Sequence, residues 1–321
     1  MVNKSYASHH ARIAQLVEHT TDTREVLGST PSARTMEKLK IGFIGQGMVG
    51  KNTADNFEGR GFEVVRYSLE PQYVANKNLI KTCDIVFIAV PTPTTPKGFD
   101  DSILRKEIKL AGEGKIVVIK STILPGTTES IQKENPGIYV LHSPEFLVAS
   151  KAREGTDNPE RNLIGLPRDI EDYRAKAELV FSVLPRAPYA KIFLSKETEL
   201  IKYVGNNFLH TKVVFMNLMY DIAQKIGADW QAVSEAVGKD SRIGSTHMNP
   251  VHASLDGKTK PGRGSGGHCF PKDFEAFLQF YQDNLSDPKG VEMLKVISDK
   301  NIELLKNSGK DAQILKEVYN I

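Results

Sequence analysis

The chain has 321 residues, and its 42 lysines and arginines nearly balance 39 aspartates and glutamates, giving a formal net charge of +3. It contains no long basic run and no apolar run of the ~20 residues that span a bilayer, so neither nucleic acid nor a membrane is indicated as a partner. The length allows two domains, and two cysteines, Cys83 and Cys269, predict no disulfide framework, which fits a cytoplasmic protein.

The first 35 residues carry neither the apolar segment of a secretory signal nor a regular hydrophobic period. Residues 11–34 resemble the peptide obtained when a transfer-RNA gene is translated. We therefore expect residues 1–35 to be a non-native or disordered leader, and native translation to begin at Met36.

Short apolar runs alternate with helical patterns over the next 160 residues, which predicts an α/β domain with a parallel sheet and crossover helices. The expected strands are residues 40–44, 63–67, 85–90, 115–119, 138–141 and a short one near 192–194. The unbroken apolar run of the third strand predicts burial on both faces. Residues 36–195 should therefore form a Rossmann-like, doubly wound domain.

A glycine-rich hexapeptide, Gly45-Gln-Gly-Met-Val-Gly50, follows the first expected strand and opens a helix. Glycines at these positions permit a tight turn and let the helix N-terminus approach a pyrophosphate. This context predicts a dinucleotide site. The residues expected to contact the coenzyme here are Gly45, Gly47, Met48, Val49 and Gly50.

The second strand lacks the acidic residue that usually follows it and binds the adenosine ribose. Ser68 stands there, with Arg66 two residues before it and Glu70 two residues after it. An arginine without a carboxylate is compatible with the 2′-phosphate of NADP, whereas Glu70 could substitute for the missing acid in an NAD site. The residues alone leave both coenzymes open.

Ligands of open parallel sheets lie beyond the carboxyl ends of the strands. The loops after the third and fourth strands are therefore expected to line the same coenzyme. Their candidate residues are Val90, Pro91, Thr92, Ser121 and Thr122.

A long helix is expected over residues 196–226, followed by a shorter one near 230–237, in an all-helical domain of residues 196–321. Lys202 and Asn206 are four residues apart and share one face of the long helix. Apolar residues at spacings of three and four predict an extended packed face. They are Leu200, Val204, Phe208, Val214, Leu218 and Ile222.

The segment Gly264-Ser-Gly-Gly-His-Cys-Phe-Pro-Lys-Asp273 places a thiol beside a glycine turn. Pro271 and the apolar run after it predict that a helix starts there, with Lys272 and Asp273 in its first turn. Because a helix N-terminus and a nearby cation favour the thiolate, Cys269 is predicted to be a nucleophile.

These motifs resemble, in order, those of the UDP-glucose/GDP-mannose dehydrogenase family. The shared strings are Val-Pro-Thr-Pro, Ser-Thr before a proline, Pro-Glu-Phe-Leu, Glu-Leu-x-Lys-x-x-x-Asn and Cys-Phe-Pro-Lys-Asp. The resemblance covers residues 36–321 and the family's first two domains, so we expect the third, nucleotide-closing domain to be absent. It implies NAD as coenzyme and a four-electron oxidation of a nucleotide sugar, UDP-glucose first, through a cysteine thiohemiacetal and thioester.

The resemblance also implies the roles of individual residues and no metal. The implied catalytic residues are Cys269, Lys202, Asn206, Asp273, Thr122 and Glu145. The implied substrate contacts are Glu145, Phe146, Leu147, Lys202, Asn206, Arg242, Gly266 and Lys272. Arg242 would serve the neighbouring subunit of a homodimer formed along the long helix. Val148, Ala149 and Ser150 depart from the family pattern and remove a second carboxylate.

Three alternatives remain. The substrate could be another nucleotide sugar, UDP-N-acetylmannosamine or GDP-mannose. A one-step hydroxyacid dehydrogenase would share the coenzyme domain and long helix but would need no Cys269. An incomplete NAD-binding fragment would require a partner chain.

Overall fold

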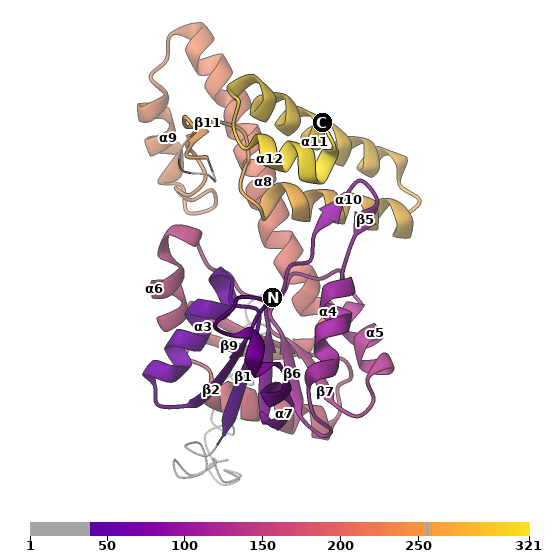
Figure 1. The fold of residues 1–321 in the computed structure, drawn as a ribbon. Coiled ribbons are helices and arrows are strands. Elements are labelled where there is room, and N and C mark those ends of the chain that lie inside the picture. The colour runs from indigo at the N-terminus through magenta and orange to yellow at the C-terminus, as the bar shows by residue number, and fades with distance from the viewer. Residues whose placement is uncertain (1–38, 255–256, 258) are drawn as a thin grey trace, which may run out of the picture. The chain divides into compact units, whose positions relative to one another are not determined.

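A seven-stranded sheet forms the core of the first half of this computed structural model, which describes residues 39–254, 257 and 259–321 (Figure 1). The strand order is β2-β1-β3-β6-β7-β8-β9. The strands are β1 (Lys40–Ile44), β2 (Glu63–Tyr67), β3 (Ile85–Ile88), β6 (Ile116–Ile119), β7 (Tyr139–His142), β8 (Arg161–Leu166) and β9 (Tyr189–Leu194). The expectations for residues 1–35 and for a start at Met36 lie outside the described residues.

The direction of the last two strands corrects the expectation of a wholly parallel sheet. Strands β2, β1, β3, β6 and β7 are parallel, and β8 is parallel to β9, but β8 runs antiparallel to β7 with His142 opposite Gly165. The connection through η3 (Ala149–Lys151) and α6 (Ala152–Asp157) therefore begins and ends at the same edge of the sheet. The doubly wound α/β class is confirmed, because helices cover both faces.

Alternate residues of β3 enter two separate cores, as a strand buried on both faces requires. Ile85 and Phe87 pack on one side of the sheet, while Val86 and Ile88 pack on the other. The first core is closed by α3 (Met48–Gly59) and α7 (Glu171–Val183). The second is closed by η1 (Val74–Thr82), α4 (Ser102–Glu107), η2 (Ile108–Leu110) and α5 (Thr127–Glu134).

The second half is largely helical, and its longest element is α8 (Ser195–Ile226), which ends where Gly227 adopts φ +76°. It packs against α10 (Phe270–Asn284) and α11 (Pro288–Ser308) (Figure 1). The other elements of this half are α9 (Trp230–Gly238), α12 (Ala312–Ile314), η4 (Leu315–Tyr319) and the short strand pair of β10 (Val251–His252) with β11 (Gly262–Arg263). A second short pair, β4 (Thr94–Thr95) with β5 (Gly98–Phe99), lies in the first half, after β3. Within the described chain, no helix has the length and apolar character needed to cross a membrane.

The apolar stripe on α8 is largely uncovered by the described residues, so the predicted packed face has no partner among them. Phe208 is 62% exposed, and only Val214 of the six predicted positions is buried, at 4% exposure. The other exposed members of the stripe are Leu200, Val204, Leu218 and Ile222, extended by Phe215 and Ile226. Hydrophobic period shows that a helix is amphipathic, but it does not show which neighbour covers the apolar face.

The inner face of α8 is instead held by polar groups, of which Glu199 is the most heavily bonded. Its buried carboxylate accepts hydrogen bonds from the backbone N–H groups of Gly126 and Thr128, at 2.6 and 2.9 Å, and from the Thr128 hydroxyl. These are donors at the N-terminus of α5, which the helix itself leaves unpaired. Glu199 thus connects the long helix α8 to α5 of the domain that contains the seven-stranded sheet.

Replacement of Glu199 by glutamine should lower the free energy of unfolding by about 2–3 kcal/mol, because the amide NH₂ would face buried donors. Chemical unfolding followed by fluorescence of Trp230, the only tryptophan in the sequence, measures this change. Glu197→Gln is the control, since Glu197 is exposed on the same helix and caps Leu194 with an oxygen that glutamine retains. Equal effects of the two variants would contradict the prediction.

Candidate active site

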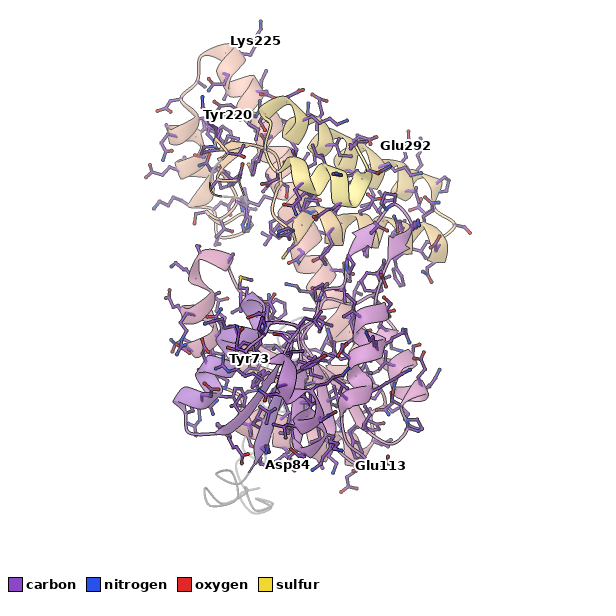
Figure 2. The ribbon with its side chains drawn as sticks, viewed as in Figure 1. Tyr73, Asp84, Glu113, Tyr220, Lys225 and Glu292 are labelled. Carbon is purple, nitrogen blue, oxygen red and sulfur yellow. The ribbon has the colours of Figure 1, made fainter. Side chains whose placement is uncertain are left out.

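The carboxyl edge of the sheet gathers motifs that lie far apart in the sequence. Strands β1 and β3 are neighbours although β2 lies between them in sequence, so the chain reverses its winding direction at this point. The glycine loop follows β1, and Val90 and Pro91 follow β3 closely. Figure 2 labels Asp84 and Glu113, which precede β3 and β6 and mark the opposite edge.

The three glycines of the first motif lie in two kinds of surroundings. A Cβ at Gly45, where φ is +89°, would lie 2.2 Å from the Ala89 carbonyl oxygen, and a Cβ at Gly50 would lie 2.0 Å from the carbonyl oxygen of Gly45. Gly47 is exposed and caps α3, and a Cβ there would meet no neighbouring atom within 4 Å. The protein thus fills the space at two glycines and leaves the third open. Met48 and Val49 form the first turn of α3 beside it.

This geometry fits a dinucleotide, because a pyrophosphate needs an unobstructed backbone at the start of the first crossover helix. Ser68 lies just beyond β2 and accepts a hydrogen bond from the Glu70 backbone N–H at 3.2 Å. The exposed Glu70 carboxylate accepts a hydrogen bond from Gln72 at 2.6 Å. The Arg66 guanidinium contacts α3 and not Ser68.

Five further residues expected to contact the coenzyme lie in the loops after β3 and β6, which hydrogen-bond to each other. The Ser121 hydroxyl accepts a hydrogen bond from the Val90 N–H at 3.0 Å and donates to the Val90 carbonyl at 2.7 Å. The Thr92 hydroxyl donates to the Thr122 carbonyl at 2.7 Å. Pro91 lies exposed between them. The contact partner of Thr122 is therefore Thr92, and no described contact connects its hydroxyl with Asp273.

A second cluster forms where α8 meets the start of α10. Cys269 is the N-cap residue of α10, and Pro271 occupies its first turn, as predicted. Asn206 donates a 2.6 Å hydrogen bond to Asp273, whose other carboxylate oxygen pairs with Lys272. Asp273 is only 1% exposed. The thiol therefore sits on a helix end whose first turn is fixed to α8.

Lys202 connects this cluster to the loop after β7. Its Nζ donates to the Glu145 carbonyl at 2.9 Å and lies 3.6 Å from the Glu145 carboxylate. The second carboxylate oxygen of Glu145 accepts a hydrogen bond from the Leu147 N–H at 2.6 Å. Phe146 lies beneath the Arg161 guanidinium, 3.7 Å from its ring centroid. The structure thus brings Lys202, Glu145, Phe146 and Leu147 together.

A cavity of about 330 Å³ adjoins Glu145 and is also lined by Lys120, Lys151, Glu154 and Arg161. Burial lowers the pKa of Lys120 to about 8, with Lys202 acting in the same direction and Glu145 opposing it. Sequence reasoning gave Lys120 no role. Its only sequence signal was its position directly after a buried strand, at the edge where ligands bind.

The electrostatics of Cys269 differ from the expectation of a favoured thiolate. Desolvation raises the pKa of the thiol, Asp273 and Glu145 raise it as well, and Lys202 and Lys272 only partly oppose them. The residue as a whole is exposed, although the surrounding protein is dense enough to desolvate its thiol and raise the pKa. The prediction considered the cations and the helix end and omitted the buried carboxylate one turn away.

The glycine loop before Cys269 is held by side chains that sequence analysis missed. The Asn301 side chain forms two hydrogen bonds with the backbone of Ser265, at 2.6 and 2.9 Å, and the buried Lys310 ammonium donates to the Gly264 carbonyl at 3.1 Å. Asp311 accepts a hydrogen bond from the Gly267 N–H at 3.0 Å.

Gly266 faces the same group, since a Cβ there would lie 2.0 Å from the Asp311 carboxylate. The available signal was Gly309 followed by Lys310 and Asp311, a helix end with an aspartate in the left-handed region, φ +51°. Nothing in the local pattern linked that helix end to the thiol.

Arg242 lies apart from both clusters. Its side chain is 87% exposed and pairs with Asp240 in the same turn at 2.6 Å. Among the described residues, it contacts none of the predicted site residues of its own chain. Across residues 39–254, 257 and 259–321, no group of three or more His, Cys, Asp or Glu side chains is arranged to hold a metal ion.

A dinucleotide site at the switch point and a thiol beside a lysine, an asparagine and an aspartate define a dehydrogenase-type architecture. Residues 73–182 match the NAD binding domain, and residues 196–301 the central domain, of the UDP-glucose/GDP-mannose dehydrogenase family. The chain belongs to this family.

Relatives named UDP-glucose 6-dehydrogenase are similar in sequence. The protein from Rhizobium meliloti is 35% identical over 70% of this chain and 52% of its own length, and TuaD from Bacillus subtilis is 37% identical over 62% and 43%. A solved UDP-glucose dehydrogenase from Pyrobaculum islandicum superposes with a TM-score of 0.69 at 28% identity, covering 87% of this chain and 70% of that one. This chain spans about half the length of the two curated relatives.

Alkylation of Cys269 by iodoacetamide should show a pH midpoint above the ordinary thiol value of 9.0, because the raised pKa leaves less thiolate at neutral pH. Peptide mass spectrometry separates it from the buried Cys83. Lys272→Met should move the midpoint further up, since it removes an opposing cation. The exposed Lys289, on α11, provides the control Lys289→Met. A midpoint below 9.0, or the same shift in both variants, would contradict this account.

Proposed function

We propose that the chain is an NAD-dependent nucleotide-sugar 6-dehydrogenase that converts UDP-glucose to UDP-glucuronate. Residues 36–195 would bind the coenzyme, and residues 196–321 would bind the sugar and form a dimer. The observation that carries the proposal is the cluster of Cys269, Lys202, Asn206 and Asp273 described above. A thiol adds nothing to a simple alcohol oxidation, whereas a thiol that binds an aldehyde covalently can carry it to the acid level without release.

The first oxidation turns the sugar C6 hydroxyl into an aldehyde. NAD, when bound, accepts the hydride. Asp273, with Thr122, would hold a water that takes the hydroxyl proton, and Lys202 and Asn206 would stabilise the developing oxyanion by charge and hydrogen bonding. Lys202 is 7% exposed and Asn206 is buried beside it, so both act with little competition from solvent.

The second oxidation uses Cys269. Its sulfur would add to the aldehyde carbon as a thiohemiacetal; the hydroxyl of that adduct would lose its proton, and its carbon would give a hydride to a second NAD, leaving a thioester. Water, activated by Glu145, would cleave the thioester to the carboxylate and restore the thiol. Phe146, Leu147, Gly266 and Lys272 would complete the walls of the sugar site.

The test is the number of NADH formed per sugar by the full chain with UDP-glucose, with UDP-N-acetylmannosamine, GDP-mannose and NADP run in parallel. Two NADH per UDP-glucose are expected. Cys269→Ser should form no acid, whereas Cys83→Ala, which removes the buried thiol, should keep the stoichiometry of two.

Each other result identifies an alternative. One NADH per sugar would indicate a one-step hydroxyacid-type dehydrogenase. Two NADH with a different sugar would correct the substrate. No turnover with any of them would indicate a fragment that needs a partner chain, and acid formation by Cys269→Ser would refute the thioester route.

We also propose that the exposed apolar stripe of α8 forms a homodimer interface. Its members recur at spacings of three, four and seven residues from Leu200 to Ile226, so they occupy one continuous side of the helix. An exposed stripe of this length is unusual for a soluble monomer. Arg242, exposed and unconnected to its own chain's site, would reach the substrate of the partner subunit.

Phe208→Lys combined with Ile222→Lys should convert the dimer to a monomer, because each places a charge in the middle of the apolar stripe. Sedimentation velocity measures the mass, and circular dichroism checks that the helices persist. Gln224→Lys is the control, since it adds the same charge to an exposed position on another side of α8. Dimers in all variants, or a monomeric wild-type chain, would refute this interface.

A further inference from the structure

The coenzyme site lacks the carboxylate that normally meets the adenosine ribose, yet two carboxylates lie close by on α3. The Arg66 guanidinium donates to both oxygens of Glu58, at 2.9 and 2.7 Å, and its Nη2 lies 2.7 Å from the Asp55 carboxylate. Arg66 is only 8% exposed. Both acids occupy the same helix that opens at the exposed Gly47, and the arginine lies on the strand that ends beside Ser68.

The position of Arg66 relates this cluster to the glycine loop. Its Nη1 lies 3.4 Å from the side-chain oxygen of Gln46, the residue between the first two motif glycines. Gln46 is buried and donates to the Gly45 carbonyl at 3.1 Å. A hollow of about 420 Å³ borders the same groups and is lined by Asp55, Glu58, Arg66 and Tyr73, the last labelled in Figure 2.

Several charged side chains surround Arg66, and their pairing bears on which coenzyme fits here. One guanidinium faces two carboxylates, and Lys51, which also binds Asp55 at 3.0 Å, brings the sum of these four charges to zero, so no net positive charge gathers here. Arg153 lies 3.8 Å from Asp55 and donates a 2.8 Å hydrogen bond to Asp157, and Glu70 is exposed and bonded to Gln72. Among the described residues around this hollow, a 2′-phosphate would find no arginine free to bind it, whereas a 2′-hydroxyl needs none.

We propose that Asp55 and Glu58 determine the preference for NAD over NADP by holding Arg66 against α3. They replace, from the helix, the discrimination that an acidic residue at position 68 usually supplies from the strand. The inference rests on the coenzyme class of the proposed function, but it concerns binding alone and is independent of the sugar that is oxidised.

Isothermal titration calorimetry with NAD⁺ and with NADP⁺, without sugar, tests it. The double variant Asp55→Asn with Glu58→Gln keeps the shape of both side chains and removes their charge. It should tighten NADP⁺ binding about tenfold and change NAD⁺ binding less than about threefold. Adding Arg66→Gln should abolish the gain, because the freed guanidinium is the expected phosphate ligand.

Glu63→Gln is the matched control. Glu63 lies on the same strand as Arg66, at the other end of β2, and pairs with Lys40 of β1. Glu58→Gln alone, at a half-exposed position, should give a smaller gain in the same direction and serves if the double variant melts early. An unchanged NADP⁺ affinity in folded variants, or a gain that survives Arg66→Gln, would overturn the inference.

Failure of the proposed function gives a different result. Coenzyme binding with the expected ratios, but without oxidation of any sugar, would leave the inference standing and refute the enzyme assignment. Absence of binding of either coenzyme to the wild-type chain would overturn both.

Discussion

The hydrogen bond from Asn206 to the buried Asp273 is the contact on which the site depends, because it fixes the start of α10 against α8. Cys269 caps α10, and Lys202 lies one turn before Asn206 on α8. One polar contact therefore sets the thiol and the ammonium in relation to each other. Since Asp273 is almost fully enclosed, the loss of Asn206 would leave one carboxylate oxygen without a donor, while Lys272 would still pair with the other.

The two sides of α8 carry different kinds of side chain. Its inner side carries Glu199, Lys202 and Asn206, which connect it to α5, the loop after β7 and α10 respectively. Its outer side carries large apolar groups that no described element covers. Most helices of globular proteins bury their apolar side internally. Here α8 also buries apolar side chains such as Tyr203 and Val213, and the polar contacts are specific in direction, which suits a helix that must hold reacting groups in register.

Local signals predicted much of the fold. The bounds expected for β1 and β2 are those observed, and α8 begins one residue before its expected start, because apolar runs and glycines mark element ends directly. The reversed direction of β8 could not be predicted, since it depends on the edge along which the connection returns. The period of the α8 stripe predicted a packed face without showing which surface covers it, because periodicity does not identify the covering surface.

The sequence motifs identified the site residues, but they did not predict the pKa of Cys269 or the contacts that hold the glycine loop. Cys269, Lys202, Asn206 and Asp273 were found because each lies in a recognisable string. The direction of the Cys269 pKa was not, because it depends on how far burial and Asp273 outweigh two lysines. Asn301, Lys310 and Asp311 escaped notice because their contacts are formed across more than thirty residues of chain.

Those three anchors limit what the signature segment can do by itself. Gly264–Gly267 owes its path to the end of α11 and the turn after it, and Gly266 leaves no room for a methyl group beside Asp311. The ten residues around Cys269 are therefore not a transplantable unit. A scaffold given this segment alone would possess the nucleophile without the contacts that position it. Substitutions at Lys310 or Asp311 would in turn disturb a loop about forty residues earlier in the chain.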